Sequence, residues 1–295
     1  MFSSIRGKVA REEPLKRHTS WQIGGPAEIF IEPADPEDLI QAIDLAKQAG
    51  LPLFILGNGT NILVSDKGVR GLVIKIGRGF DHKRIKGKRI FAGAAATLVS
   101  LARVAAANGL GGLEFAIGIP GTLGGALVMN AGANNANIGS LVNSVRVILP
   151  DGEMREKSGH ELEFGYRCSK LEGSGEIVIG AILESYSRDP AAIKKDMDTY
   201  LAGRRLSQPR GYPNAGSVFK NPRGYSAGQL VEASGCKGME RGGAQVSLKH
   251  ANFIVNRGNA TAGDVMYLIE RVREKVRDTY EIELKTEIKI WGDRL

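Results

Sequence analysis

Residues 56–64 read Leu56-Gly57-Asn58-Gly59-Thr60-Asn61-Ile62-Leu63-Val64. A short apolar run, residues 53–56, leads directly into the glycines and predicts a buried strand. Several backbone N–H groups can hold a phosphate only where no side chain obstructs its approach, so glycine, Asn and Thr gather in such loops. The stretch therefore indicates either an anion-binding loop or a tight turn between two buried strands.

The loop matches neither of the two common nucleotide-binding motifs. A dinucleotide fingerprint needs a third glycine at position 62 and then a helix, but Ile62 stands there and an apolar extended run follows. A Walker loop needs Gly-Lys-Ser or Gly-Lys-Thr, which the sequence lacks. Any nucleotide held by this loop is held by a different kind of fold.

A second glycine-rich segment follows later in the chain, Ile119-Pro120-Gly121-Thr122-Leu123-Gly124-Gly125. It precedes the apolar run 126–129, so backbone N–H groups at the start of a predicted helix can face an anion. Two such loops suit a diphosphate that runs between two subdomains.

The segment Ala215-Gly216-Ser217-Val218-Phe219-Lys220-Asn221-Pro222 places a hydroxyl, an ammonium and an amide in one short, apolar-flanked run. Local chemistry alone favours equally a strand end with a solvated lysine, since Ser, Asn and Pro commonly mark turns. A hydrolase serine fits poorly, because a nucleophile elbow would need glycines where Ala215 and Phe219 stand. A fourth segment, Gly165-Tyr166-Arg167, adds a permanently charged donor.

In their order along the chain, the four segments resemble those of the UDP-N-acetylenolpyruvoylglucosamine reductase family, the flavin enzymes that complete the muramic acid precursor of bacterial peptidoglycan. The resemblance runs from about Thr19 to Glu287. It implies an α+β fold, with an FAD-binding domain of the vanillyl-alcohol oxidase (PCMH) type in two α+β subdomains and a C-terminal α+β substrate-binding domain. Little space separates Ser217 from Glu287 for the tyrosine-bearing loop of longer relatives, so the chain resembles the short, type II form.

The expected domain bounds follow from this resemblance and from a predicted helix that starts near residue 191. They are an N-terminal extension at residues 1–18, an FAD-binding domain at 19–188 with subdomains of about 19–80 and 81–188, and a substrate-binding domain at 189–295.

The resemblance also implies the reaction, which is NADPH-dependent, FAD-mediated reduction of UDP-N-acetylglucosamine enolpyruvate to UDP-N-acetylmuramate. FAD is bound non-covalently and NADPH donates hydride; flavin N5 passes it to the terminal enolpyruvyl carbon, and Ser217 protonates the adjacent carbon. Arg167 matches the arginine that holds the substrate carboxylate, and Glu287 matches the catalytic glutamate. The implied cofactor contacts are Gly57, Asn58, Gly59, Thr60, Asn61, Pro120, Gly121, Thr122, Gly124 and Gly125, and the implied substrate contacts are Tyr166, Lys220 and Asn221.

Local pattern alone leaves several roles open. Glu281, Glu283 and Glu287 share one face of a predicted half-buried strand over residues 282–290, and each is equally suited to a solvated position. Two positions depart from the family pattern, with Gln22 where arginine is frequent and Glu281 where glycine is usual. Arg204 and the adjoining basic stretch suit either a diphosphate or a solvated helix end.

Other helices and strands are predicted from caps, breakers and apolar periodicity. Asp35-Pro36 starts a helix that Gly50 ends, and Thr261 with Asp264 has the spacing of a capping box. Without a regular βαβ alternation, the pattern indicates an α+β protein. The further predicted elements are strands at 69–76, 89–92, 145–149 and 176–185 and helices at 97–108, 191–206 and 262–279.

Composition limits the class of protein. The 295 residues are 42% hydrophobic, enough for two or three packed units, and the net charge of +8 suits nucleic acid or anionic small molecules. The basic cluster at 83–89 has no interleaved aromatic residues, which favours small anions and predicts no nucleic-acid partner. The only cysteines, Cys168 and Cys236, lack a CxxC or His-rich neighbour, so neither a metal site nor a disulfide is expected.

The sequence also bears on location and on rival functions. The first 17 residues lack the apolar core of a signal peptide, and no run approaches the ~20 apolar residues of a membrane span, so a cytoplasmic protein without membrane contact is expected. The oligomeric state stays open, with a monomer as the starting assumption. The rivals are another FAD oxidoreductase of this fold, a non-catalytic nucleotide-binding protein, and a Cys168 nucleophile with a distant histidine.

Overall fold

The computed structural model describes residues 2–292. The chain forms two compact units, each assembled from several segments. The first unit comprises the described residues up to Arg11 together with residues 29–58 and 71–204. The second comprises residues 12–28 and 59–70 and the chain from Arg205 onward.

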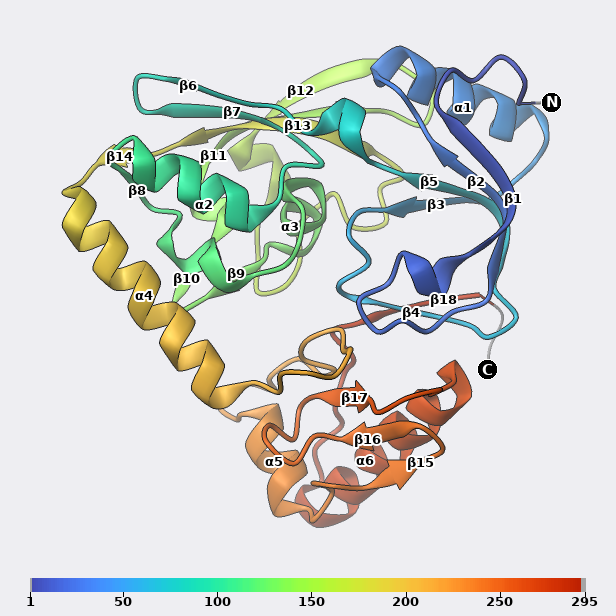
Figure 1. Ribbon diagram of the computed structural model, residues 1–295, viewed down its shortest axis with the longest axis vertical. Coiled ribbons are helices and arrows are strands. Elements are labelled where there is room, and N and C mark those ends of the chain that lie inside the picture. Colours follow the sequence, from blue (N-terminus) through green and yellow to red (C-terminus); the bar gives the residue numbers. More distant parts are fainter. Residues whose placement is uncertain (1, 293–295) are drawn as a thin grey trace. The chain divides into compact units, whose positions relative to one another are not determined.

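A four-stranded sheet has the order β1 (Lys8–Pro14), β2 (Pro26–Glu32), β5 (Val69–Lys75) and β3 (Leu53–Leu56) (Figure 1). Strands β3 and β5 are parallel, with Leu56 opposite Lys75. The prediction of a buried strand at 53–56 is wrong in its burial, since Leu53 is 38% exposed and only Leu56 is buried. The reason is topological, because an edge strand has a neighbour on one side only.

Helix α1 (Pro36–Gln48) begins at its predicted cap, where Asp35 accepts the N–H of Asp38 at 2.9 Å. Asp38 is itself 1% exposed, and its carboxylate accepts N–H groups from Arg6 (2.8 Å), Gly7 (2.9 Å) and Ala34 (2.9 Å). Burial acts to raise the pKa of Asp38, but these backbone donors outweigh it and hold the pKa below its ordinary value. The charged carboxylate thus ties the N-terminal segment to α1.

An Asp38→Asn variant is expected to lose about 2 kcal/mol of unfolding free energy at pH 7, because an amide nitrogen then faces a backbone donor. The folded-state pKa is lowered, so the stabilisation by Asp38 is present above the ordinary carboxyl pKa of 3.8 and is lost as the pH falls through the lower folded value. Denaturant titrations at several pH values should therefore show that the difference in unfolding free energy between wild type and Asp38→Asn becomes smaller below pH 3.8. Asp44→Asn, on the exposed side of α1, is the control and should leave both curves unchanged.

The larger sheet of the first unit has five antiparallel strands, of which β6 and β7 form a hairpin (Figure 1). Helices α2 and α3 contribute Leu98, Leu101, Leu123 and Leu127 to its hydrophobic core. The sheet order is β12 (Met154–Ser158), β11 (Val142–Ile148), β13 (Ile177–Glu184), β7 (Arg89–Gly93) and β6 (Lys83–Lys86). The remaining elements of this unit are α2 (Leu98–Ala107), α3 (Leu123–Met129), the pairs β8 (Leu110–Gly111) with β14 (Tyr186–Ser187) and β9 (Gly132–Ala133) with β10 (Ala136–Asn137), the 3-10 helices η2 (Arg78–Phe80), η3 (Glu114–Gly118), η4 (Ile138–Leu141) and η5 (Gly159–Leu162), and α4 (Pro190–Ser207), which continues beyond the unit's last residue.

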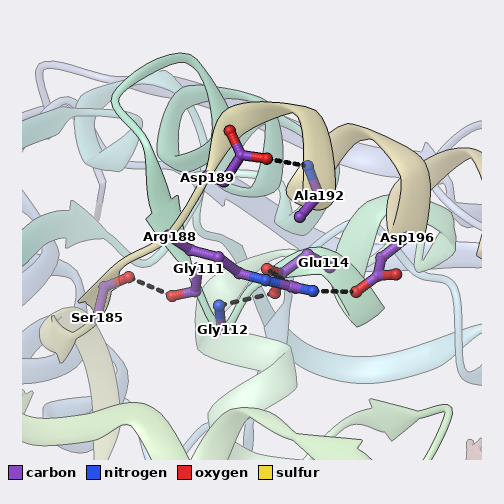
Figure 2. A network of polar contacts seen from close by, with 8 residues as sticks. All are labelled: Gly111, Gly112, Glu114, Ser185, Arg188, Asp189, Ala192 and Asp196. Carbon is purple, nitrogen blue, oxygen red and sulfur yellow. Dashed lines mark hydrogen bonds and ion pairs between the residues drawn. The ribbon is translucent and has the colours of Figure 1, made fainter.

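The start of α4 is tied to η3 by a polar network (Figure 2). Arg188 donates to Glu114 and to Asp196, each at 2.7 Å. Glu114 also accepts the N–H of Gly112 at 2.7 Å. The network holds the start of α4 against η3, the segment that precedes residues 119–125.

The second unit contains a short antiparallel sheet, β15 (Glu240–Arg241), β16 (Ala244–Val246) and β17 (Ile254–Asn256), against which α6 (Ala262–Tyr280) packs (Figure 1). The predicted capping box of α6 is confirmed, with Thr261 and Asp264 each accepting the other's backbone N–H at 3.0 Å. The other elements are η1 (Leu15–Arg17), α5 (Ala227–Ala233) and the parallel pair of β4 (Ile62–Val64) with β18 (Lys289–Trp291).

The predicted strand at 282–290 is correct only for its last residues, since β18 begins at Lys289. Between the helix and β18 the chain is irregular, and it makes one isolated bridge, Phe219 with Thr286. Leu284 and Ile288 are buried four residues apart, on the face where a strand would place them, but the segment before Lys289 lacks the continuous ladder pairing that a strand needs. The segment is held by side chains and single backbone bonds instead.

Candidate functional site

The first predicted loop meets the second within the first unit. A Cβ on Gly57 would lie 2.6 Å from the Thr122 hydroxyl. Only glycine therefore lets the backbone at position 57 come this close to the Thr122 side chain. The Asn58 amide donates to the Pro120 carbonyl at 3.5 Å. The structure thus brings together two glycine-rich segments that lie far apart in the sequence.

The loop then continues into the second unit, where Gly59 has a φ of +59° and a Cβ would lie 2.1 Å from the His18 carbonyl oxygen. The Gly59 carbonyl accepts the N–H of Ser20 at 3.0 Å. Among residues 2–292, no protein acceptor takes the backbone N–H groups of residues 57–60. These donors are the ones that an anion needs.

The expected role for the start of α3 is wrong in one respect. Its first N–H groups are already taken, with Leu123 donating to Ala96 (2.8 Å), Gly124 to Ala94 (2.9 Å) and Gly125 to the Thr122 hydroxyl (3.4 Å). A Cβ on Gly124 would lie 3.1 Å from that of Ala94, so close packing is one reason for glycine there. The sequence pattern alone does not distinguish donors that face a ligand from donors that pair within the protein.

Tyr166 and Arg167 form the tip of a tight turn between Gly165 and Cys168, which bond to each other through both backbone pairs (3.0 and 3.4 Å). Arg167 has a φ of +55° and is half-buried, while Tyr166 is 57% exposed. The guanidinium donates to the Gly132 carbonyl at 2.9 Å and lies 5.4 Å from the Tyr166 ring centroid. Such a cation held near an exposed ring is suited to an anionic, partly apolar ligand.

Ser217 lies in the second unit, between a glycine of positive φ and a segment held by several hydrogen bonds. Gly216, with a φ of +78°, precedes it, and Phe219 follows in a segment clamped by Asn252. The Asn252 side chain accepts the Phe219 N–H and donates to the Phe219 carbonyl, both at 2.9 Å, and is 4% exposed. The backbone carbonyl of Asn252 also accepts the N–H of Val218, at 2.8 Å.

The other side of this segment is held by the chain that carries Glu287. The backbone N–H of Glu287 donates to the Val218 carbonyl at 2.7 Å, and the backbone N–H of Lys220 donates to the Lys285 carbonyl at 2.9 Å. The Asn61 side chain donates to the Glu287 carbonyl at 3.1 Å. Glu287 is therefore bonded directly to Asn61 and to Val218, the residue that follows Ser217, within the second unit.

Two predicted or suspected residues have structural partners of their own. Asn221 accepts the N–H of Ala227 at 2.9 Å, at the first residue of α5. The Arg204 side chain lies across η3, where a Cβ on Gly118 would be 2.8 Å from its Cδ, and burial lowers the pKa of this guanidinium. Sequence reasoning missed Asn252, because an asparagine that clamps a backbone from both sides looks, in one sequence, like any other.

Several site classes find no support in the part of the chain that is described. No group of three or more His, Cys, Asp or Glu side chains there could hold a metal ion. Cys168 and Cys236 are both free thiols. Over the same residues, the helices are all too short or too polar to cross a membrane.

Comparison with known proteins finds two family matches. Residues 27–158 match the FAD binding domain, and residues 208–291 match the UDP-N-acetylenolpyruvoylglucosamine reductase C-terminal domain. A UDP-N-acetylenolpyruvoylglucosamine reductase of Heliobacterium modesticaldum is 50% identical over 98% of this chain and 92% of its own, and one of Moorella thermoacetica is 48% identical over 99% and 96%. The solved structure of the reductase MurB of Thermus caldophilus is 37% identical, covers 98% of this chain and 100% of its own, and superposes with a TM-score of 0.85.

Proposed function

The chain belongs to the UDP-N-acetylenolpyruvoylglucosamine reductase family, and from this premise we propose that Arg167, Ser217 and Glu287 carry the chemistry of that reaction here. The protein is an FAD-dependent oxidoreductase that uses NADPH to reduce UDP-N-acetylglucosamine enolpyruvate to UDP-N-acetylmuramate, a step of peptidoglycan precursor synthesis. We place this activity in the cytoplasm, the compartment of NADPH and nucleotide sugars. The single observation that carries the residue assignment is the direct bonding of the Ser217 segment to the Glu287 segment.

The glycine-rich loops fit a bound dinucleotide. Residues 57–60 present backbone N–H groups that take no protein acceptor among the described residues, and Gly57 leaves no room for a side chain against Thr122. We assign the diphosphate of FAD to these donors and propose Pro120, Gly121 and Thr122 as further cofactor contacts, since Pro120 and Thr122 lie against Asn58 and Gly57 within the first unit. Held by these residues, FAD would supply the hydride chemistry between NADPH and the enolpyruvyl group.

Arg167 holds the substrate carboxylate and stabilises the negative charge that spreads onto it after hydride addition. Ser217 then gives a proton to the adjacent carbon, so the double bond gains one hydride and one proton and NADPH leaves as NADP⁺. An alcohol is a weak acid, so the Lys220 ammonium in the same segment steadies the alkoxide. The backbone of Glu287 is held by the Val218 carbonyl and by the Asn61 side chain. The protonated carboxyl group of Glu287 donates a hydrogen bond to the enolate.

The remaining assignments extend this proposal. Tyr166 covers the substrate beside Arg167, and Asn221 contacts the UDP-sugar through its NH₂ group, since its oxygen accepts the Ala227 N–H. The assignment of an FAD-binding domain to 19–188, a substrate-binding domain to 189–295 and a short N-terminal extension stays a prediction.

A Gly57→Ala variant is expected to bind FAD at least about tenfold more weakly, because the new methyl group displaces the Thr122 hydroxyl and disturbs the loop that it supports. Equilibrium titration of apoprotein with FAD measures this. Gly203→Ala is the control, since a Cβ there meets nothing within 4 Å and the helical backbone suits alanine. Equal FAD affinity in the two variants would contradict the placement of the diphosphate.

The function itself is tested by absorption spectroscopy of purified protein in two steps. Anaerobic NADPH should bleach the flavin band, and UDP-N-acetylglucosamine enolpyruvate should restore it with formation of UDP-N-acetylmuramate. A flavin that is bleached but indifferent to this substrate would indicate another FAD oxidoreductase of the same fold. Colourless protein that cannot be reconstituted with FAD would indicate a non-catalytic nucleotide-binding protein.

A further inference from the structure

Asn130 is a buried asparagine at the C-terminal end of α3, and only 5% of it is exposed. Its side-chain NH₂ donates to the Gly165 carbonyl at 2.7 Å, and its side-chain oxygen accepts the N–H of Gly139 at 3.0 Å. Both polar ends of the amide are thus used, and they join α3, η4 and the Arg167 turn. We propose that Asn130 is the positioning residue for Arg167, a role that rests on the function proposed above.

The bond to Gly165 acts on the turn that carries Arg167. Gly165 and Cys168 close this turn through two backbone hydrogen bonds, so its tip moves with the Gly165 carbonyl. The turn is tight, since a Cβ at Gly165 would lie 2.8 Å from the Cys168 sulfur and only glycine fits there, and Arg167 has a φ of +55°, which few side chains adopt. Loss of the bond from Asn130 therefore shifts the turn as one piece.

The Arg167 guanidinium is tied to the same short segment. It donates to the carbonyl of Gly132, two residues beyond Asn130, at 2.9 Å. Arg167 is thus anchored to residues 130–132 at two points, through its turn and through its side chain. Any movement between the turn and this segment changes the direction of the guanidinium, which must hold a planar carboxylate with both oxygens in place.

The backbone at Asn130 limits which residues can serve. Its φ is +43°, in the left-handed region that ends α3, where glycine and asparagine are tolerated best. Among these, only asparagine supplies a donor for Gly165 and an acceptor for Gly139. The same helix begins at Thr122, in the second glycine-rich loop, so α3 connects the proposed cofactor loop with the arginine that holds the substrate.

Two variants distinguish the effect of the side-chain hydrogen bonds of Asn130 from the effect of its left-handed backbone conformation. Asn130→Asp keeps the size and the acceptor for Gly139 but places an oxygen against the Gly165 carbonyl. Asn130→Gly keeps the left-handed backbone and removes both bonds, and it replaces the first variant if that one fails to fold. Asn135→Asp is the matched control, because Asn135 is also left-handed (φ of +62°) but exposed.

Ligand binding to the oxidised holoenzyme gives the first measurement. UDP-N-acetylmuramate carries the carboxylate that Arg167 holds, whereas UDP-N-acetylglucosamine lacks it. Calorimetric titration should show the Asn130 variants binding UDP-N-acetylmuramate about tenfold more weakly and UDP-N-acetylglucosamine within about twofold of wild type. Equal weakening of both ligands would indicate a general structural defect and would overturn the proposal.

Stopped-flow half-reactions give the second measurement. NADPH should reduce the flavin at the wild-type rate, while oxidation by the enolpyruvyl substrate should slow by about 10- to 100-fold. In an Arg167→Ala background, Asn130→Gly should add less than about twofold, because the residue through which it acts is gone. An undiminished further loss in that background would overturn the role of Asn130. An Arg167→Ala variant that oxidises normally would instead refute the assignment of Arg167 itself.

Discussion

Replacement of Ser217 by alanine is expected to slow oxidation of the reduced flavin by UDP-N-acetylglucosamine enolpyruvate by about 10²- to 10⁴-fold, the usual contribution of a positioned general acid. Reduction by NADPH needs no proton from Ser217 and should stay within about twofold of wild type. Fold stability should change little, since the Ser217 hydroxyl makes no hydrogen bond to the described residues. Anaerobic stopped-flow absorbance measures both half-reactions separately.

Ser234→Ala is the matched control for this experiment. Ser234 ends α5 in the same unit, and its buried hydroxyl finds no partner among the described residues, so its loss should leave both half-reactions unchanged. If Ser217→Ala slowed the two half-reactions equally, the residue would be part of the flavin environment and not the proton donor. Normal oxidation of the reduced flavin in Ser217→Ala would assign the proton to another group.

The second large effect is expected at Arg167. Arg167→Ala should slow the substrate half-reaction by about 10³-fold, because it removes a charge-assisted pair at a carboxylate that gains charge during the reaction. Arg167→Lys keeps the charge and loses the planar fork, so it should recover only part of the rate. The substrate KM should rise together with the fall in kcat, as determined from steady-state kinetics with each variant.

Arg188→Lys is the control, because it replaces another hydrogen-bonded arginine of the first unit that has no proposed role in the reaction. Arg188 bonds Glu114 and Asp196 at the start of α4, and its replacement should lower stability while the two half-reactions retain their ratio (Figure 2). Unchanged KM and kcat for the enolpyruvyl substrate in Arg167→Ala would show that Arg167 does not bind the substrate.

Features that depend on neighbouring residues could be predicted from the sequence. The Asp35 cap and the box of Thr261 with Asp264 are confirmed, since both need only a few consecutive residues. The resemblance to the reductase family is likewise confirmed by the full-length matches. The expectation of glycine at position 281 has a physical basis, since Glu281 ends α6 with a φ of +57°, in the left-handed region that favours glycine.

Features that depend on distant partners could not be predicted. The exposure of Leu53 follows from the place of β3 at a sheet edge, and the irregular path before Lys289 follows from bonds to the Ser217 segment. The side-chain clamps of Asn130 and Asn252 are equally long-range, joining residues more than thirty positions apart. Exposed Gln22 has a φ of +57°, and nothing in the structure assigns it the charge contact that an arginine would make there.

The parallel pairing of β4 with β18 ties the residues beside the first glycine-rich loop to a segment far away in the sequence. Lys289 donates to the Asn61 carbonyl at 2.9 Å, and the Trp291 carbonyl accepts the N–H of Ser65 at 2.8 Å, so the residues around the first loop rest on the last described strand of the polypeptide. The first loop is therefore supported by a strand from a distant part of the sequence, so a change that disrupts β18 should also disturb the loop.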